Sequence, residues 1–125
     1  MDGNHFKTGL QLRSLIRDDR ELELSLGAME VPSAQADEVV VRVEASPINP
    51  SDIGLMFAVV DMNTARQAGM SAAPVVTARI PKERMNVVAG RVGQSMTVGN
   101  EGAGVVVEAG SSAEMQALLG RTVAL

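Results

Sequence analysis

The 125-residue chain has no cysteine, no tyrosine and no tryptophan, and its one histidine is His5. The missing thiols exclude disulfides, thiolate zinc sites and a cysteine nucleophile. Without tyrosine, the chain supplies no phenol as a proton donor. A single histidine near the N-terminus provides neither a histidine cluster for a metal nor an interior serine–histidine pair. The residue inventory therefore argues against a metal site and against thiol catalysis.

Strong charge of one sign is also lacking, because 11 Lys and Arg are set against 15 Asp and Glu, for a formal net charge of -4. Nucleic-acid-binding proteins normally show a basic stripe, so this balance argues against a nucleic-acid partner. No run approaches the ~20 apolar residues of a membrane-spanning helix. The polar residues 1–7 lack the apolar core of a signal peptide. We therefore expect no membrane partner and a cytoplasmic location.

Apolar residues make up 46% of the chain, which is enough for the packed core of one domain. Alternation of apolar and polar residues with a period of two, together with valine enrichment, predicts β-strands. The predicted strands are residues 10–16, 21–26, 38–45, 105–109 and 122–125. The fold class is therefore predicted to be mainly β with short helices.

A short helix is predicted after the third strand, from residue 50 to Phe57. Asn49 is a favourable N-cap, and Pro50 suits the first helical position. Asp52 falls at the third position, where an acidic side chain interacts well with the helix dipole. For Asn49 and Asp52, helix capping alone is one interpretation, and a place in a functional site is the other.

Residues 58–98 are the least regular part of the sequence. Asp61 and Gly69 resemble the start and the stop of a short helix, and Pro81 resembles the first residue of another that ends near Gly90. Residues 72–80 have no clear periodicity. We therefore expect residues 58–98 to be an irregular insertion with short helices.

A glycine cluster with the spacing G-x-x-G-x-G occupies residues 99–104. A dinucleotide-binding loop follows a strand and opens a helix, so that the pyrophosphate meets helix N–H groups. Here the glycines lead into a strand, which argues against phosphate binding by this cluster. The glycines are typical of a sharp bend or a close backbone contact at a strand entry.

Three segments, taken in order, resemble the N-terminal GroES-like domain of the medium-chain dehydrogenase/reductase superfamily. They are EVVVRVEASPINPSDI at 38–53, GNEGAGVVVEAG at 99–110 and GRTVAL at 120–125. Within the superfamily, the likeness is to zinc-free quinone oxidoreductases and enoyl-thioester reductases. It covers residues 10–57 and 98–125.

The resemblance implies that residues 1–125 form a partly closed, mostly antiparallel β-barrel, truncated before a Rossmann domain. In such enzymes NADPH or NADH lies in the cleft between the two domains, bound mainly by the Rossmann domain. Hydride passes to a small-molecule carbonyl, quinone or enone substrate, and the full-length enzyme is expected to be a homodimer. The barrel itself is expected to be incomplete at Leu125.

The resemblance also assigns site residues. Zinc-dependent members hold the metal through a cysteine near the position of Asn49 and a histidine at the position of Asn100, so asparagine at both predicts no zinc. Asn49 would face the nicotinamide and substrate end of the cleft, and Asp52 would fix the turn that presents it. Asn100 and Glu101 would line the opposite wall, with Gly102 allowing close approach. Such groups orient and polarise a carbonyl by hydrogen bonds.

Enoyl-thioester reductases place a tyrosine proton donor shortly after the segment at 49–52, whereas this chain has Met-Phe-Ala at 56–58. This departure favours a quinone or enone reductase. We therefore predict the substrate-domain portion of a zinc-independent NAD(P)H-dependent oxidoreductase, inactive as this fragment. The alternative is a stand-alone GroES-like binding or assembly module without catalysis.

Overall fold

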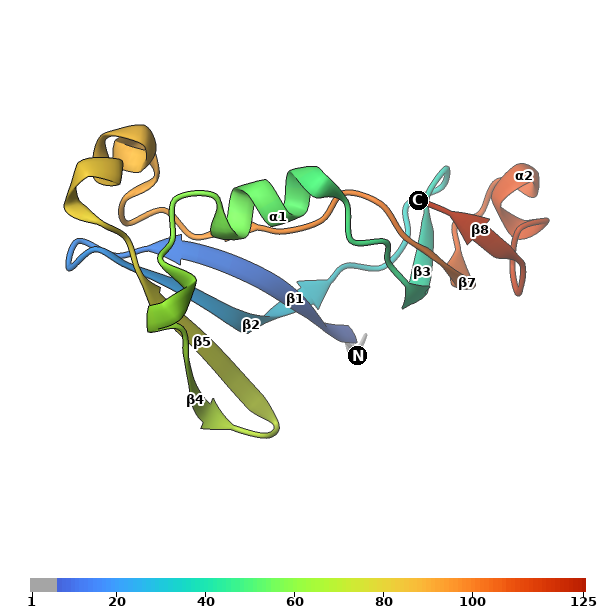
Figure 1. Ribbon diagram of the computed structural model, residues 1–125. Coiled ribbons are helices and arrows are strands. Elements are labelled where there is room, and N and C mark those ends of the chain that lie inside the picture. The colour runs from blue at the N-terminus through green and yellow to red at the C-terminus, as the bar shows by residue number, and fades with distance from the viewer. Residues whose placement is uncertain (1–6) are drawn as a thin grey trace. The chain divides into compact units, whose positions relative to one another are not determined.

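The computed structural model describes residues 7–125, so His5 lies outside the described part of the chain. The chain divides into two compact units, which we describe separately. Of the described residues, unit 1 contains 7–9, Glu30–Pro47 and Gly99–Leu125, and unit 2 contains Leu10–Met29 and Ile48–Val98. Both units consist mainly of strands joined by loops and short helices (Figure 1), which confirms the predicted secondary-structure class.

Unit 2 is built on a five-stranded sheet with the order β4-β5-β2-β1-β6. The β1–β6, β2–β5 and β4–β5 pairs are antiparallel. A tight turn links β1 to β2, with Arg20 at a φ of 64° and the N–H of Arg17 donating to the carbonyl of Glu21 at 2.8 Å. The strands are β1 (Lys7–Ile16), β2 (Glu21–Val31), β4 (Arg66–Met70), β5 (Ala73–Arg79) and β6 (Met96–Thr97). The outer ends of β1 and β2 belong to unit 1.

Three short helices complete unit 2, namely α1 (Pro50–Phe57), η1 (Met62–Thr64) and η2 (Lys82–Arg91). Side chains from α1 and η2 pack against the buried ends of β1, β2 and β5. The buried hydrophobic residues are Ile16, Leu22, Leu24, Val60, Ala78, Ile80 and Val88. Leu22 and Leu24 come from the alternating stretch that predicted a half-buried strand, so the periodicity identified the core face of β2.

The segment 58–98 is more regular than predicted. A helix was expected from Asp61 to Gly69, but η1 has only three residues and the chain then enters β4. Asp61 does cap η1, since its carboxylate accepts a hydrogen bond from the N–H of Asn63 at 3.0 Å. Gly69 has a φ of 78° beside the β4–β5 turn, where a Cβ would meet the carbonyl oxygen of Ala73. Glycine therefore stabilises a hairpin here instead of ending a helix.

The irregular character expected of segment 58–98 needs correction for the same reason, whereas its being an insertion stays a prediction. β5, which had no clear periodicity in the sequence, pairs with β2 over five residue positions. The segment also supplies Val60, Ala78, Ile80 and Val88 to the core. The helix predicted from Pro81 forms as the 3₁₀ helix η2, whereas the one predicted from Asp61 is reduced to the three residues of η1.

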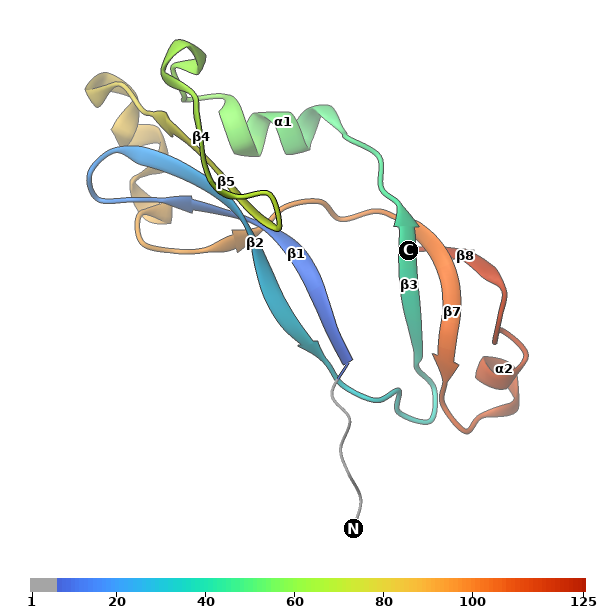
Figure 2. The same ribbon diagram turned by 90° about the horizontal axis from the view of Figure 1, so that it is seen from below.

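Unit 1 contains a three-stranded sheet with the order β3-β7-β8, formed by β3 (Val39–Ala45), β7 (Ala103–Ala109) and β8 (Thr122–Ala124), and a short helix α2 (Ala113–Gln116). Figure 2 shows β7 between β3 and β8. Both pairs are antiparallel. At Gly104 a Cβ would meet the backbone of Arg42, and at Gly110 it would meet the backbone of Gln35 and Ala36. These two glycines allow β3 and the loop before it to lie close against β7.

Within residues 7–125, neither sheet closes on itself. The larger sheet ends at β4 and β6, and the smaller one ends at β3 and β8. The predicted partly closed GroES-like barrel is therefore not confirmed and stays a prediction. In the part of the chain that the structure describes, no helix is long and apolar enough to cross a membrane.

Candidate functional site

The first group of predicted site residues lies at the N-terminus of α1, in unit 2. Asn49 is the N-cap, with extended backbone angles of -86° and 154°, and Pro50 is the first helical residue. The Asp52 carboxylate accepts a hydrogen bond from the backbone N–H of Asn49 at 2.9 Å and is buried, with 8% of its surface exposed. Asp52 thus fixes the turn that carries Asn49, which is the local role predicted for it.

The second group, Asn100, Glu101 and Gly102, forms the loop that enters β7 in unit 1. Asn100 and Glu101 are exposed, whereas Gly102 is half-buried. The carbonyl of Gly102 accepts a hydrogen bond from the N–H of Leu125 at 2.8 Å. A Cβ on Gly102 would lie 3.3 Å from the carbonyl oxygen of Ala45, which is tighter than ordinary packing. Glycine therefore lets this loop run close to the end of β3.

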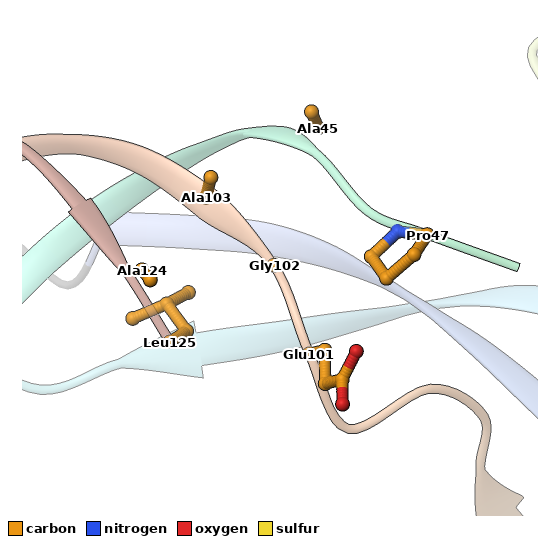
Figure 3. A pocket seen from close by; sticks show the side chains of 7 residues that line it. All are labelled: Ala45, Pro47, Glu101, Gly102, Ala103, Ala124 and Leu125. Atoms are coloured by element: carbon orange, nitrogen blue, oxygen red, sulfur yellow. The ribbon is translucent and has the colours of Figure 1, made fainter. Parts of the chain in front are cut away.

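The ends of the three strands of unit 1 frame a pocket of about 360 Å³. Its lining residues are Ala45, Pro47, Glu101, Gly102, Ala103, Ala124 and Leu125 (Figure 3). The register of the sheet explains this grouping, because Ala103 pairs with Ala45 on one side and with Ala124 on the other. Small side chains on three adjacent strands leave a hollow, and Glu101 supplies its carboxylate.

The structure groups only part of the predicted site. Glu101 and Gly102 line one pocket, while Asn100 precedes them in the same loop. Asn49 and Asp52 belong to unit 2 and form their own hydrogen-bonded turn. The prediction that the two groups face each other across a cleft therefore stays a prediction.

The sequence-based assignment missed the apolar lining residues. Pro47 and Leu125 lie within the segments that resembled the family, but they have no polar group that would have marked them as site residues. Ala45 and Ala124 lie about 80 positions apart in the chain. Only the strand register places them at one pocket, so no local signal in the sequence could have found them.

β7 also bears an acidic side chain with two partners, Glu108. Its carboxylate forms an ion pair with Lys7 and accepts a hydrogen bond from the backbone N–H of Ala34 at 2.8 Å. The hydrogen bond from Lys7, followed by the one from Ala34, lowers the pKa of Glu108 below its ordinary value. Glu108 thereby fastens the loop at 32–37 to the strand that follows the pocket.

In unit 2, Arg91 links α1 to the sheet. Its guanidinium donates hydrogen bonds to the carbonyl of Leu55 at 3.1 Å and to the hydroxyl of Ser14 at 3.0 Å. Ser14 is fully buried, so Arg91 satisfies a hydroxyl that would otherwise be costly to bury. Partial burial lowers the pKa of Arg91. This contact ties α1, whose N-cap is Asn49, to strand β1.

Among residues 7–125, no three histidine, aspartate or glutamate side chains converge as metal ligands would. The absence of zinc stays a prediction from the asparagines at positions 49 and 100. The chain matches no model of a known protein family and no curated protein.

Proposed function

We propose that this chain is the N-terminal, substrate-domain portion of a zinc-independent NAD(P)H-dependent oxidoreductase, similar to quinone and enone reductases of the medium-chain dehydrogenase/reductase superfamily. One observation supports it beyond the likeness of the three segments. The β3–β7 register pairs Ala45 with Ala103, so Pro47 from the first segment and Glu101 from the second line the same pocket. Leu125, from the third segment, lines it too. If the three segments formed one substrate site, residues from each of them would have to lie close together, as Pro47, Glu101 and Leu125 do.

The proposed substrate is a small carbonyl compound, a quinone or an enone. The hollow of about 360 Å³ is open to solvent, since Ala45, Glu101 and Ala124 along it are exposed, so it could cover part of a single-ring acceptor but not enclose a dinucleotide. The mostly apolar lining favours such a ring. The dinucleotide would then be bound mainly by a further domain.

The cofactor supplies the hydride in this reaction class, and the residues of this chain bind and orient the acceptor. The resemblance, not the pocket of unit 1, assigns the amide N–H₂ of Asn49 a hydrogen bond to the acceptor oxygen, which would favour the negative charge that develops there. Asp52 positions Asn49 through the capping hydrogen bond. The chain has no tyrosine, so the proton that balances the hydride comes from solvent or from the further domain.

The GroES-like barrel, dimerisation of the full-length enzyme and a cytoplasmic location are parts of the same proposal. They come from the resemblance and from the polar character of residues 1–7, and each can be tested separately from the chemistry.

The proposal is tested on the complete protein encoded by the reading frame that contains this chain. Oxidation of NADPH and NADH is measured with a quinone or an enone as acceptor. Asn49→Ala should lower kcat by roughly 100- to 1,000-fold because one donor to the developing oxyanion is lost. Asn86→Ala, which changes an exposed asparagine on η2, is the matched control and should be neutral. Unchanged kcat and KM in Asn49→Ala would refute the site assignment.

A stand-alone GroES-like binding or assembly module without catalysis is the second candidate. It is favoured by the apolar surface of unit 1, where Val43, Leu119 and Leu125 are about half exposed. Exposed apolar surface is typical of proteins that associate. Sedimentation distinguishes the candidates, because a discrete ring supports an assembly module, whereas a monomer or a dimer argues against it.

A further inference from the structure

The outer edge of β3 is unpaired. β3 is the terminal strand of its sheet, and no strand within residues 7–125 pairs with its other side. It has seven residues, against three for β8 at the opposite edge. The half from Arg42 to Ala45 is exposed, and Val43 has 52% of its surface open. Exposed edges of this length are templates for pairing with another chain.

The charges on this edge alternate in sign. The Arg42 guanidinium donates a hydrogen bond to the Glu44 carboxylate at 3.0 Å, and both side chains are more than half exposed. This contact places the two charged groups on the same face of the strand. Val43, between them, points to the other face because side chains alternate along a strand.

This arrangement is complementary to itself in one antiparallel register. When two copies of β3 pair about Val43, Arg42 of each copy lies opposite Glu44 of the other, and Val43 lies opposite Val43. Pairing about Arg42 or about Glu44 would instead set like charges directly opposite each other, which is destabilising. Charge complementarity therefore selects a single two-fold register.

We propose that the outer edge of β3 pairs antiparallel with β3 of a second copy of this chain. The two-fold axis passes beside Val43, as in an isologous dimer. On one face of the paired strands, Arg42 of each copy lies next to Glu44 of the other. On the opposite face, the two Val43 side chains meet. The proposal does not depend on the proposed function, since it follows from the strand edge alone.

The dimer is expected to be weak. The contact is one short strand pair, which places it below the roughly 1,200 Å² typical of stable interfaces. The pairing of β3 with β7 also shifts register between Val43 and Ala45, and the bend expected at such a shift limits the length of a second ladder. Since the charges are exposed, added salt should weaken the contact.

Sedimentation velocity over a concentration series tests the proposal with the 125-residue chain. Arg42→Glu makes the edge wholly acidic and Glu44→Arg makes it wholly basic, so each variant should dimerise at least roughly tenfold more weakly. The double variant R42E/E44R restores opposite charges in the same register and should dimerise like the original chain. Arg84→Glu is the matched control, because it makes the same charge change at an exposed position on η2.

An equimolar mixture of the two single variants is the sharpest test. The wholly acidic edge of one variant would then face the wholly basic edge of the other, so the mixture should form a mixed dimer although neither variant pairs well alone. Circular dichroism checks that each variant folds. A monomer at all concentrations of the original chain overturns the proposal, and so does a dimer that neither single variant weakens. A mixture that stays monomeric also overturns it.

Discussion

Unit 2 and unit 1 are both mainly β, but they bury side chains to different extents. Seven of the eight buried hydrophobic residues among the described positions belong to unit 2, and Val106 is the one in unit 1. β3 is nonetheless the most valine-rich strand, and its Val43 is half exposed. High β-propensity is therefore enough to form a strand, whereas a buried core also needs an element that covers one face of the sheet.

Unit 1 is held together in other ways. Gly104 and Gly110 let backbones approach closely, and Glu108 connects Lys7 and Ala34 to β7. In unit 2, by contrast, side chains of α1 and η2 pack on the sheet, including Phe57 and Val88. The following predictions test whether side-chain packing contributes most to the stability of unit 2 and close backbone contact contributes most to that of unit 1.

The largest effect is expected from Ile16→Ala in unit 2. Ile16 is fully buried, so the variant should lower the free energy of unfolding by about 2–5 kcal/mol through lost burial and a cavity. Urea denaturation measures the change. Leu119→Ala, at an exposed position of unit 1, is the control and should stay within about 0.5 kcal/mol. Equal losses in the two variants would contradict the contrast between the units.

A smaller loss is expected from Gly110→Ala in unit 1. The new methyl group would overlap the backbone of Gln35 and Ala36, which should cost about 1–3 kcal/mol. Gly54→Ala makes the same change within α1, where nothing lies within 4 Å of the added carbon. It should stabilise by up to about 1 kcal/mol because alanine favours helix. Thermal unfolding measures the midpoint temperature of both variants. If both midpoints shifted in the same direction, close backbone contact at Gly110 would not explain the result.

Loss of the Asp52 hydrogen bond at the start of α1 should lower the free energy of unfolding by about 1 kcal/mol. Asp52→Ala eliminates the acceptor of the Asn49 N–H, and the start of α1 should fray. Ser51→Ala changes the exposed neighbour and should be nearly neutral. Backbone amide exchange at residues 49–52 reports the fraying. If both variants exchange alike, Asp52 does not fix the turn that presents Asn49.

The smallest effect is expected from the titration of Glu108. Its pKa is lowered in the folded state, so the carboxylate stabilises the fold above its ordinary pKa, and this contribution is lost as the pH falls through the lowered value. The free energy of unfolding of Glu108→Gln should therefore be lower than that of the original chain at pH 7. The two free energies should converge well below pH ~4. Amide exchange at Ala34 follows the loss locally. A difference that persists unchanged at pH 2 would contradict this linkage.

Local chemistry explains which parts of the fold could be predicted from the sequence. Asn49, Pro50 and Asp52 specify the start of α1 through contacts within four residues, and the structure confirms that start. The leucine alternation in β2 depends only on the two-residue period of a strand. Elements of this kind are encoded by their own residues.

Long-range pairing explains what could not be predicted. Asp61 and Gly69 are equally suitable for a short helix and for the 3₁₀ turn and hairpin that form, and pairing of β5 with β2 decides between them. The pocket depends on register in the same way, because Ala45 and Ala124 flank Ala103 only after the sheet has formed. The sequence marked Glu101 and Gly102, but not the small residues that leave the hollow.

The most direct test of the central proposal is oxidation of NADPH and NADH by the complete protein, with a quinone as acceptor and a metal chelator present. The proposal predicts that at least one cofactor is oxidised in step with quinone reduction, and that the chelator does not change the rate. No oxidation of either cofactor would contradict the proposed function. Oxidation that the chelator abolishes and zinc restores would contradict the metal-free mechanism.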